Sequence, residues 1–84
     1  MKPCFLYAVL CDDLTIYAGV SLDVLRRVKQ HNGVLRGGAK YTRSRRPVRL
    51  LAMKKFESRS VALKAERWFK TLSHKEKLKE IERW

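Results

Sequence analysis

The strongest constraint on the fold is a pair of short apolar segments near the N-terminus, separated by a turn that contains two aspartates. Residues 5–11 and residues 15–18 each have the length and apolar character of a β-strand. A three-residue loop between them pairs Val9 with Tyr17 and brings Tyr7 to the same face as Tyr17, whereas a two-residue loop would separate the tyrosines. We therefore expect a β-hairpin that carries both tyrosines on one face.

The remaining segments predict three helices and one further strand. Ser21 is a suitable N-cap for the first helix, and Ser73 begins the last one with a capping-box pattern. The order β-β-α-β-α-α predicts a single α+β domain over residues 1–84, with a three-stranded antiparallel sheet flanked by helices. The expected segments are a helix to residue 31, a Gly-rich basic loop over 33–46, a strand over 48–53, a helix from Ser58 or Ser60 through 72, and a short last helix.

The charge of the chain favours a polyanionic partner. Twenty Lys and Arg face eight Asp and Glu, a formal net charge of +12 at pH 7, which raises affinity for polyanions and speeds encounter with them. A chain this short buries a modest core, so we expect a shallow site that suits a long polymer. No single helix gathers the basic residues opposite an apolar stripe, which disfavours a membrane surface. The alternative is a basic but otherwise ordinary soluble protein.

Cys4 and Cys11 indicate a reducing compartment. Two cysteines in a small chain without a signal peptide are typical of reduced thiols, and no histidine joins them at zinc-ligand spacing. The N-terminal apolar run is too short for a membrane span and makes a poor signal peptide. We expect a cytoplasmic protein.

Glu66 is the most informative residue of the second helix. It lies beyond the edge of the apolar stripe, where a carboxylate can be partly shielded from water, and the alternative is a simple i,i+4 ion pair with Lys70. The predicted stripe has at its centre Val61, Ala65, Trp68 and Leu72, with Ala62 and Phe69 to one side.

Other candidate residues have two interpretations each. Tyr7 and Tyr17 can form a site or simply pack on the sheet with their hydroxyls in water. Arg27 and His31 are neighbours on the first helix, where they can act together or serve as a solvated charge and a favourable helix end. The basic loop can bind phosphates and stack an aromatic on an unpaired base, or be merely solvated; its candidate nucleic-acid-binding residues are Lys40, Tyr41, Thr42, Arg43, Arg45 and Arg46.

The combination of these residues resembles the GIY-YIG endonucleases, and in particular their small stand-alone bacterial members. Phe5-Leu6-Tyr7 and Tyr17-Ala18-Gly19 are similar to the two halves of the signature, with both tyrosines and the second glycine retained. The family arginine corresponds to Arg27, a following His or Tyr to His31, and the metal-binding glutamate to Glu66. Many members carry an Asn after that glutamate, whereas the single Asn of this chain is Asn32.

The resemblance implies a DNA endonuclease, with RNA as a further substrate class, no membrane association and no obligate protein partner. Mg²⁺ or Mn²⁺ would be held by Glu66, Arg27 would clamp the phosphate, and Tyr7, in preference to Tyr17, would take the proton of the attacking water with help from His31. Arg27 and the metal would favour the phenolate of that tyrosine. We expect these side chains to cluster within roughly 10 Å, about one nucleotide's reach. The rivals are a non-catalytic nucleic-acid-binding module and a small basic structural protein.

Overall fold

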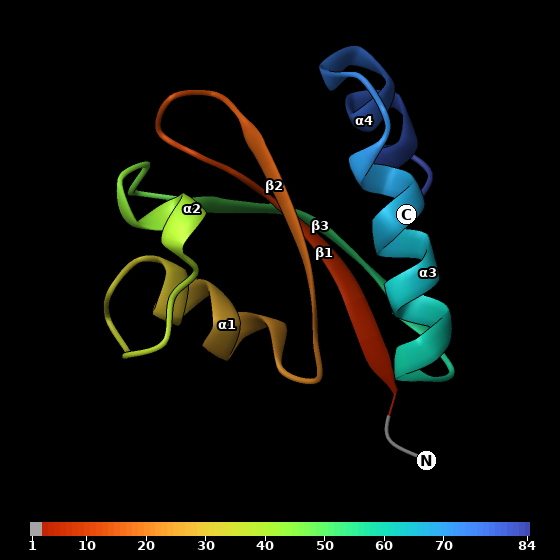
Figure 1. Ribbon diagram of the computed structural model, residues 1–84, viewed down its shortest axis with the longest axis horizontal. Helices are drawn as coiled ribbons and strands as arrows, with labels where there is room; N and C mark the ends of the chain where they lie inside the picture. Colours follow the sequence, from red (N-terminus) through yellow and green to blue (C-terminus); the bar gives the residue numbers. More distant parts are fainter. Residues whose placement is uncertain (1–2) are drawn as a thin grey trace.

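The computed structural model describes residues 3–84 and has the expected α+β architecture (Figure 1). A three-stranded antiparallel sheet has the strand order β2-β1-β3, so the first strand of the chain lies at its centre. A short helix, α2, was not predicted and lies in the basic loop. The elements are β1 (Cys4–Leu10), β2 (Ile16–Ser21), α1 (Val24–His31), α2 (Lys40–Arg43), β3 (Arg49–Phe56), α3 (Arg59–Lys70) and α4 (His74–Ile81).

The hairpin has the three-residue loop that we predicted. The backbone N–H of Cys11 donates to the carbonyl oxygen of Thr15 at 2.9 Å, which closes the turn. Val9 lies opposite Tyr17, and Tyr7 lies opposite Gly19. The two tyrosines therefore share one face of the sheet.

Helix starts follow their capping residues, with one correction. The side chain of Asp23, and not that of Ser21, caps α1 by accepting from the backbone N–H of Arg26. Ser21 instead accepts from the backbone N–H of Asp23 at 3.0 Å, so it shapes the turn before the helix. The predicted capping box of α4 is confirmed, because Ser73 and Glu76 bond to each other's backbone N–H groups.

The sheet separates two apolar clusters, because successive strand residues point to opposite faces. Figure 1 shows α3 and α4 on one side of the sheet and α1 and α2 on the other. Phe69 of α3 packs on the even-numbered residues of the hairpin, which are Leu6, Ala8, Ile16 and Ala18. The opposite cluster joins α1 to Tyr7, Val9, Cys11, Val24 and Val48. Both tyrosines consequently face α1.

Helix α3 is rotated relative to the predicted stripe. Ala62 and Phe69 are fully buried, whereas Val61 is 47% exposed and Trp68 is 52% exposed. The helix pattern places Trp68 at the centre of the stripe and Phe69 to one side, whereas the sheet buries the row that contains Ala62 and Phe69 most deeply. This rotation moves Glu66 toward the buried face, so that only 18% of the surface of its side chain is exposed.

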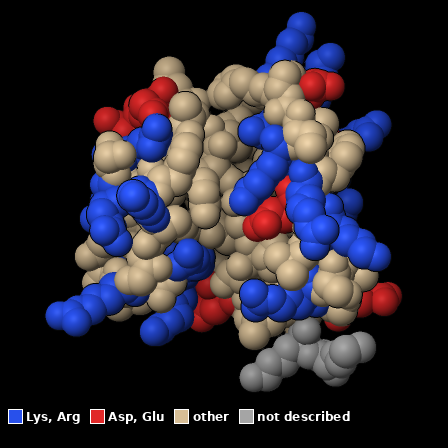
Figure 2. All heavy atoms as spheres, viewed as in Figure 1, with Lys and Arg blue, Asp and Glu red and all other residues tan. Residues whose placement is uncertain are grey.

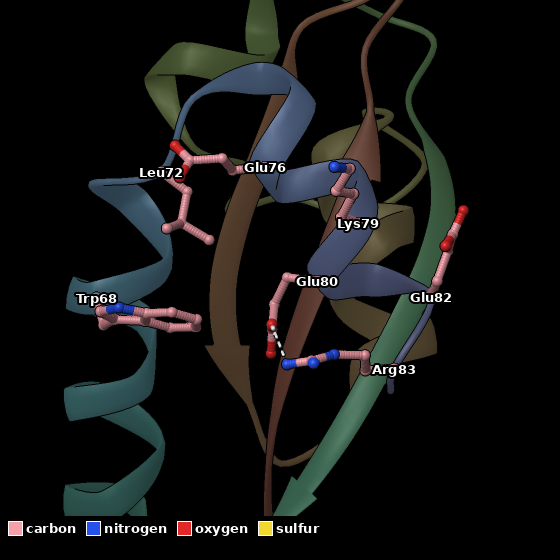
Figure 3. A pocket seen from close by; sticks show the side chains of 7 residues that line it. All are labelled: Trp68, Leu72, Glu76, Lys79, Glu80, Glu82 and Arg83. Carbon is pink, nitrogen blue, oxygen red and sulfur yellow. Dashed lines mark ion pairs between the residues drawn. The ribbon is translucent and has the colours of Figure 1, made fainter.

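Trp68 borders a groove between α3 and α4 (Figure 3). On the α4 side of the groove, Glu80 and Arg83 form an ion pair with 3.8 Å between Oε1 and Nη1. The groove therefore combines one apolar wall with a charged one. No helix within residues 3–84 combines the length and apolar character that a bilayer crossing requires.

Candidate active site

Tyr7 and His31 form a buried hydrogen bond between the sheet and α1. The phenol oxygen Oη of Tyr7 lies 2.7 Å from Nε2 of His31. Both side chains are almost completely buried, with 1% and 0% of their surfaces exposed. A short bond between two groups that can both exchange protons is suited to proton transfer.

The other ring nitrogen of His31 contacts Thr42, which lies in α2. Nδ1 of His31 lies 2.9 Å from Oγ1 of Thr42, and Thr42 is fully buried. Our expectation that the Thr42 side chain binds nucleic acid is therefore wrong, because the side chain has no surface left for that contact. A threonine within a basic loop gave no sequence signal of burial.

Gly19 makes room for the phenol of Tyr7. A Cβ atom at Gly19 would lie 2.7 Å from Cζ of Tyr7 and closer still to Oη. Real Cβ atoms do not approach other atoms this closely, so any side chain at this position displaces the ring. The glycine that follows Tyr17-Ala18 is thus needed for close packing across the β1–β2 pair.

Tyr17 lies at the start of a stack of rings and cations. Its ring centroid is 5.3 Å from that of His31 and 5.3 Å from that of Tyr41, on which it stacks. Arg45 covers the Tyr41 ring with its Cζ atom 4.0 Å from the centroid, and its Nε donates to Asp13 at 2.9 Å. Tyr41 thus contacts Tyr17 and Arg45 while 38% of its surface remains exposed, and its stacking on a base stays a prediction.

The cations of the basic loop divide into two classes. Arg45 is bound as described, and Nε of Arg46 donates to the backbone carbonyl of His31 at 2.6 Å. Within the described part of the chain, no side-chain hydrogen bond or ion pair engages Lys40 or Arg43. That all four bind phosphate stays a prediction; Lys40 and Arg43 have no competing partner among the described residues, whereas Arg45 and Arg46 also hold the loop to the rest of the protein.

Arg27 reaches the same phenol from α1. The charge of Arg27 lowers the pKa of Tyr7, and its Nη1 donates to Oε1 of Gln30 at 2.9 Å and to the carbonyl oxygen of Gly37. A guanidinium has five donors, so donors remain for a substrate group. Arg27 is half-buried, which leaves it a route to the surface.

Glu66 approaches the site from α3 through Lys70. Nζ of Lys70 lies 3.8 Å from Oε1 of Glu66 and 5.7 Å from the centre of the Tyr17 ring. Lys70 also lines a pocket of about 280 Å³ beside Tyr17, together with Tyr41 and Lys77. Tyr7 and Tyr17 thus both contact the ring of His31, Arg27 acts on Tyr7 and His31 through its charge, and Glu66 reaches Tyr17 through this lysine.

Burial controls the protonation of the central pair. It raises the pKa of Tyr7 to about 12, and Arg27 lowers that pKa by less than burial raises it. Arg27 therefore favours the phenolate, as expected, but burial outweighs it and Tyr7 stays protonated. Burial likewise lowers the pKa of His31 to about 4, with Arg27 and Arg46 acting in the same direction. At neutral pH both groups are uncharged.

Glu66 is the anionic group that the site offers to a metal. Among residues 3–84, no three side chains of His, Cys, Asp or Glu are grouped as metal ligands. This donor set does not fit Zn²⁺, which takes three or four protein ligands. It fits Mg²⁺ or Mn²⁺, because such ions keep several waters and bind through one or two carboxylates plus substrate phosphate.

Comparison with known proteins agrees with this geometry. The family model described as the GIY-YIG catalytic domain matches residues 3–79. The chain belongs to the GIY-YIG family. This membership places it in a nuclease superfamily, and its small bacterial relatives named UPF0213 share the whole domain.

Two of these relatives show how far the similarity extends. A UPF0213 protein of Listeria monocytogenes is 49% identical over 73 residues, which cover 87% of this chain and 79% of the relative. A UPF0213 protein of Staphylococcus aureus is 46% identical over 82 residues, 96% of each chain. Their names state no activity.

Two solution NMR structures share the fold. A protein from E. faecalis superposes with a TM-score of 0.67 at 41% identity, covering 99% of this chain and 86% of that one. The UPF0213 protein from Bacillus halodurans gives a TM-score of 0.60 at 38% identity, covering 95% and 83%. The three-stranded α+β fold of this GIY-YIG protein is thus that of its relatives.

Replacing Gly19 with alanine should disturb the packing of the Tyr7 ring. The added methyl overlaps the phenol ring, and overpacking of this kind lowers the free energy of unfolding by about 1–3 kcal/mol. Urea denaturation measures this loss. In the double variant that also carries Tyr7→Phe, the phenol oxygen, which is the atom nearest to the added methyl, is absent. Part of the lost free energy of unfolding should therefore be recovered. Additive losses in the two single variants would show that the ring does not lie over Gly19.

His31 should make stability depend on pH in mild acid. Between pH 6.5, the ordinary histidine pKa, and about 4, its folded value, the unfolded chain binds more protons at this residue. The free energy of unfolding should therefore fall as pH falls through this range, by at most about 1.4 kcal/mol per pH unit, and be unaffected by this residue above it.

Urea denaturation from pH 4 to 8 measures this slope. His31→Gln should reduce the slope, and His74→Gln, at an exposed position of α4, should leave it as in the wild type. Equal slopes in all three proteins would contradict the pKa assigned to His31.

Proposed function

We propose that this GIY-YIG protein is a metal-dependent endonuclease that hydrolyses phosphodiester bonds in DNA. The observation that carries the proposal is the buried bond of 2.7 Å between Tyr7 and His31, beside the positive charge of Arg27, which lowers the pKa of the same phenol. Binding a phosphate backbone needs exposed cations, and it does not need a buried pair of proton-exchanging groups. This pair is the kind of arrangement that acid–base chemistry uses.

Proton transfer would run from water through Tyr7 to His31. With a pKa of about 12, Tyr7 is protonated at neutral pH, so it does not act as a preformed phenolate. As its oxygen takes a proton from the attacking water, its own proton passes to Nε2 of His31, which is neutral because its pKa is about 4. Tyr17, whose ring contacts His31, would line the path of the water.

Arg27 and Glu66 would handle the phosphate. The planar guanidinium of Arg27 can hold two phosphate oxygens by parallel hydrogen bonds, which a lysine cannot do. Glu66 would hold Mg²⁺ or Mn²⁺ once its loose ion pair with Lys70 opens. Such an ion supplies Lewis-acid stabilisation of the phosphate and of the departing oxygen.

The surface charge supports a nucleic-acid substrate. Figure 2 shows Lys and Arg side chains over both the α1–α2 side and the α3 side of the face drawn. Cations on both sides can contact phosphates that flank the reacting one. Cleavage assays on DNA and RNA strands of the same sequence would show which of the two the protein cuts.

A non-catalytic nucleic-acid-binding module is the second candidate. It is favoured by one observation, the ion pair of Glu66 with Lys70, because a carboxylate that serves only an i,i+4 pair needs no metal. The two functions therefore make opposite predictions for changes at these two residues.

Glu66→Gln should abolish cleavage and preserve the fold. It removes the anionic oxygen that would hold the ion, and we expect a fall in cleavage rate of at least about 100-fold, as for the loss of one important electrostatic group. DNA affinity should persist or increase because a negative charge near the phosphate is gone. The assay is cleavage of labelled single-stranded, duplex and flap DNA with Mg²⁺, Mn²⁺ or EDTA.

Lys70→Met is the matched control for this change. It breaks the same ion pair and leaves the carboxylate in place, so cleavage should be retained. Cleavage by Glu66→Gln at nearly the wild-type rate would refute the assignment of the metal ligand. A wild-type protein that binds DNA and shows no metal-dependent cleavage would favour the binding module.

Neutralising Lys40 and Arg43 should weaken DNA binding in proportion to the number of phosphates that these side chains bind. Each phosphate that is no longer bound should reduce the slope of log affinity against log salt by about one, with little change in the cleavage rate at saturating DNA. Fluorescence anisotropy at several salt concentrations measures the slope. Arg45→Gln and Arg46→Gln should instead reduce stability, because their partners lie within the protein. Unchanged slopes for Lys40 and Arg43 would remove the loop from the interface.

A further inference from the structure

We propose that Thr42 is a positioning residue that sets the tautomer of His31, so that Nε2 is free to accept the proton of Tyr7. This inference rests on the proposed function and deepens it, because it assigns a role to a residue that touches neither substrate nor metal. It follows from the hydrogen bonds around the imidazole, in which each polar atom has limited donors and acceptors.

The hydroxyl of Thr42 can only accept from His31. Oγ1 of Thr42 donates to the backbone carbonyl of Ala39 at 3.0 Å, and a hydroxyl has one proton to give. The contact of 2.9 Å between Oγ1 and Nδ1 of His31 therefore requires the proton to lie on Nδ1. A neutral imidazole with a proton on Nδ1 has an unprotonated Nε2.

The phenol at the other end of the ring agrees with this assignment. Among the described residues, the hydroxyl of Tyr7 has one hydrogen-bond partner, Nε2 of His31. The hydroxyl proton of Tyr7 then points to Nε2 of His31, 2.7 Å away. With the opposite tautomer, Nε2 would donate to the phenol, and the proton of the phenol would have no acceptor among the contacts of the described residues.

The backbone of Ala39 predicts what happens when the hydroxyl is removed. Its N–H is directed at Nδ1 of His31 at 3.5 Å; this longest polar contact of the ring is the one that favours an unprotonated Nδ1, and the contact of 2.9 Å with Thr42 outweighs it. Without Thr42's oxygen, this amide becomes the polar neighbour of Nδ1, and an amide N–H can only donate. The imidazole proton should then move to Nε2, which can no longer accept from Tyr7.

The short helix α2 holds the hydroxyl in place. The N–H of Arg43 donates to the carbonyl of Ala39 at 3.2 Å, and the N–H of Arg45 donates to the carbonyl of Thr42 at 3.0 Å. Thr42 is fully buried, so water does not compete for the imidazole. A buried neighbour that holds a histidine in the productive tautomer is an established requirement of acid–base catalysis.

The direct test is the tautomer of His31 in the wild-type protein. Long-range ¹H–¹⁵N correlation spectra at pH 7 distinguish a proton on Nδ1 from one on Nε2. The chain has two histidines, and exposed His74 is the internal reference. We expect His31 to carry its proton on Nδ1. A proton on Nε2 would overturn the proposal, and this measurement requires neither cleavage nor a variant.

Thr42→Val and Thr42→Ser separate the hydroxyl from packing. Valine keeps the shape of the side chain without a hydroxyl, so the His31 proton should move to Nε2, and cleavage at pH 7 should fall about 100-fold, within the range for loss of acid–base catalysis. DNA affinity should stay within about twofold, since a buried group makes no phosphate contact. Serine should retain both the Nδ1 proton and cleavage.

Each further outcome decides between the proposals. A Thr42→Val protein that keeps the Nδ1 proton overturns the role of Thr42, as does a Thr42→Ser protein that loses it. If the wild type cleaves no DNA but shows the expected tautomer, the endonuclease proposal fails and the positioning of His31 stands. If Thr42→Val does not fold, the wild-type and Thr42→Ser spectra still decide the question.

Discussion

The hydrogen bond between Tyr7 and His31 organises the site of this protein, because it joins the central strand to the end of α1 inside an apolar layer. Its length of 2.7 Å depends on three independent features. The hairpin register turns Tyr7 toward α1, Gly19 leaves space for the phenol, and Thr42 occupies the far side of the imidazole. Buried polar groups are costly without partners, so these features must be satisfied together.

Burial gives this bond its chemical character. The same apolar surroundings that raise the pKa of Tyr7 and lower that of His31 keep both groups neutral. A neutral donor facing a neutral acceptor buries no charge at rest; in the proposed mechanism, the proton passed to His31 makes it an imidazolium. The cations, by contrast, lie around this core, where they can meet phosphate without the cost of burial.

Several basic residues serve the fold in addition to the surface charge. Arg45 links the hairpin turn at Asp13 to the ring of Tyr41, and Arg46 binds the last carbonyl of α1. They hold the loop over the site, and through Tyr41 they support Tyr17. A high net charge therefore overstates the number of cations that are free to bind a polyanion, since part of it is engaged within the protein.

The α+β order, the hairpin register and the shared face of Tyr7 and Tyr17 follow from the sequence alone, because strand alternation and loop length are local properties of the chain. Spacing along α1 likewise places Arg27 beside His31. The rotation of α3, the burial of Thr42 and the internal partners of Arg45 and Arg46 emerge only in the folded protein. These depend on which apolar residues a narrow sheet can cover and on contacts between segments far apart in the chain. The protonation of Tyr7 belongs to the same class, since the loss of water around a buried phenol outweighs a neighbouring cation that the sequence had already revealed.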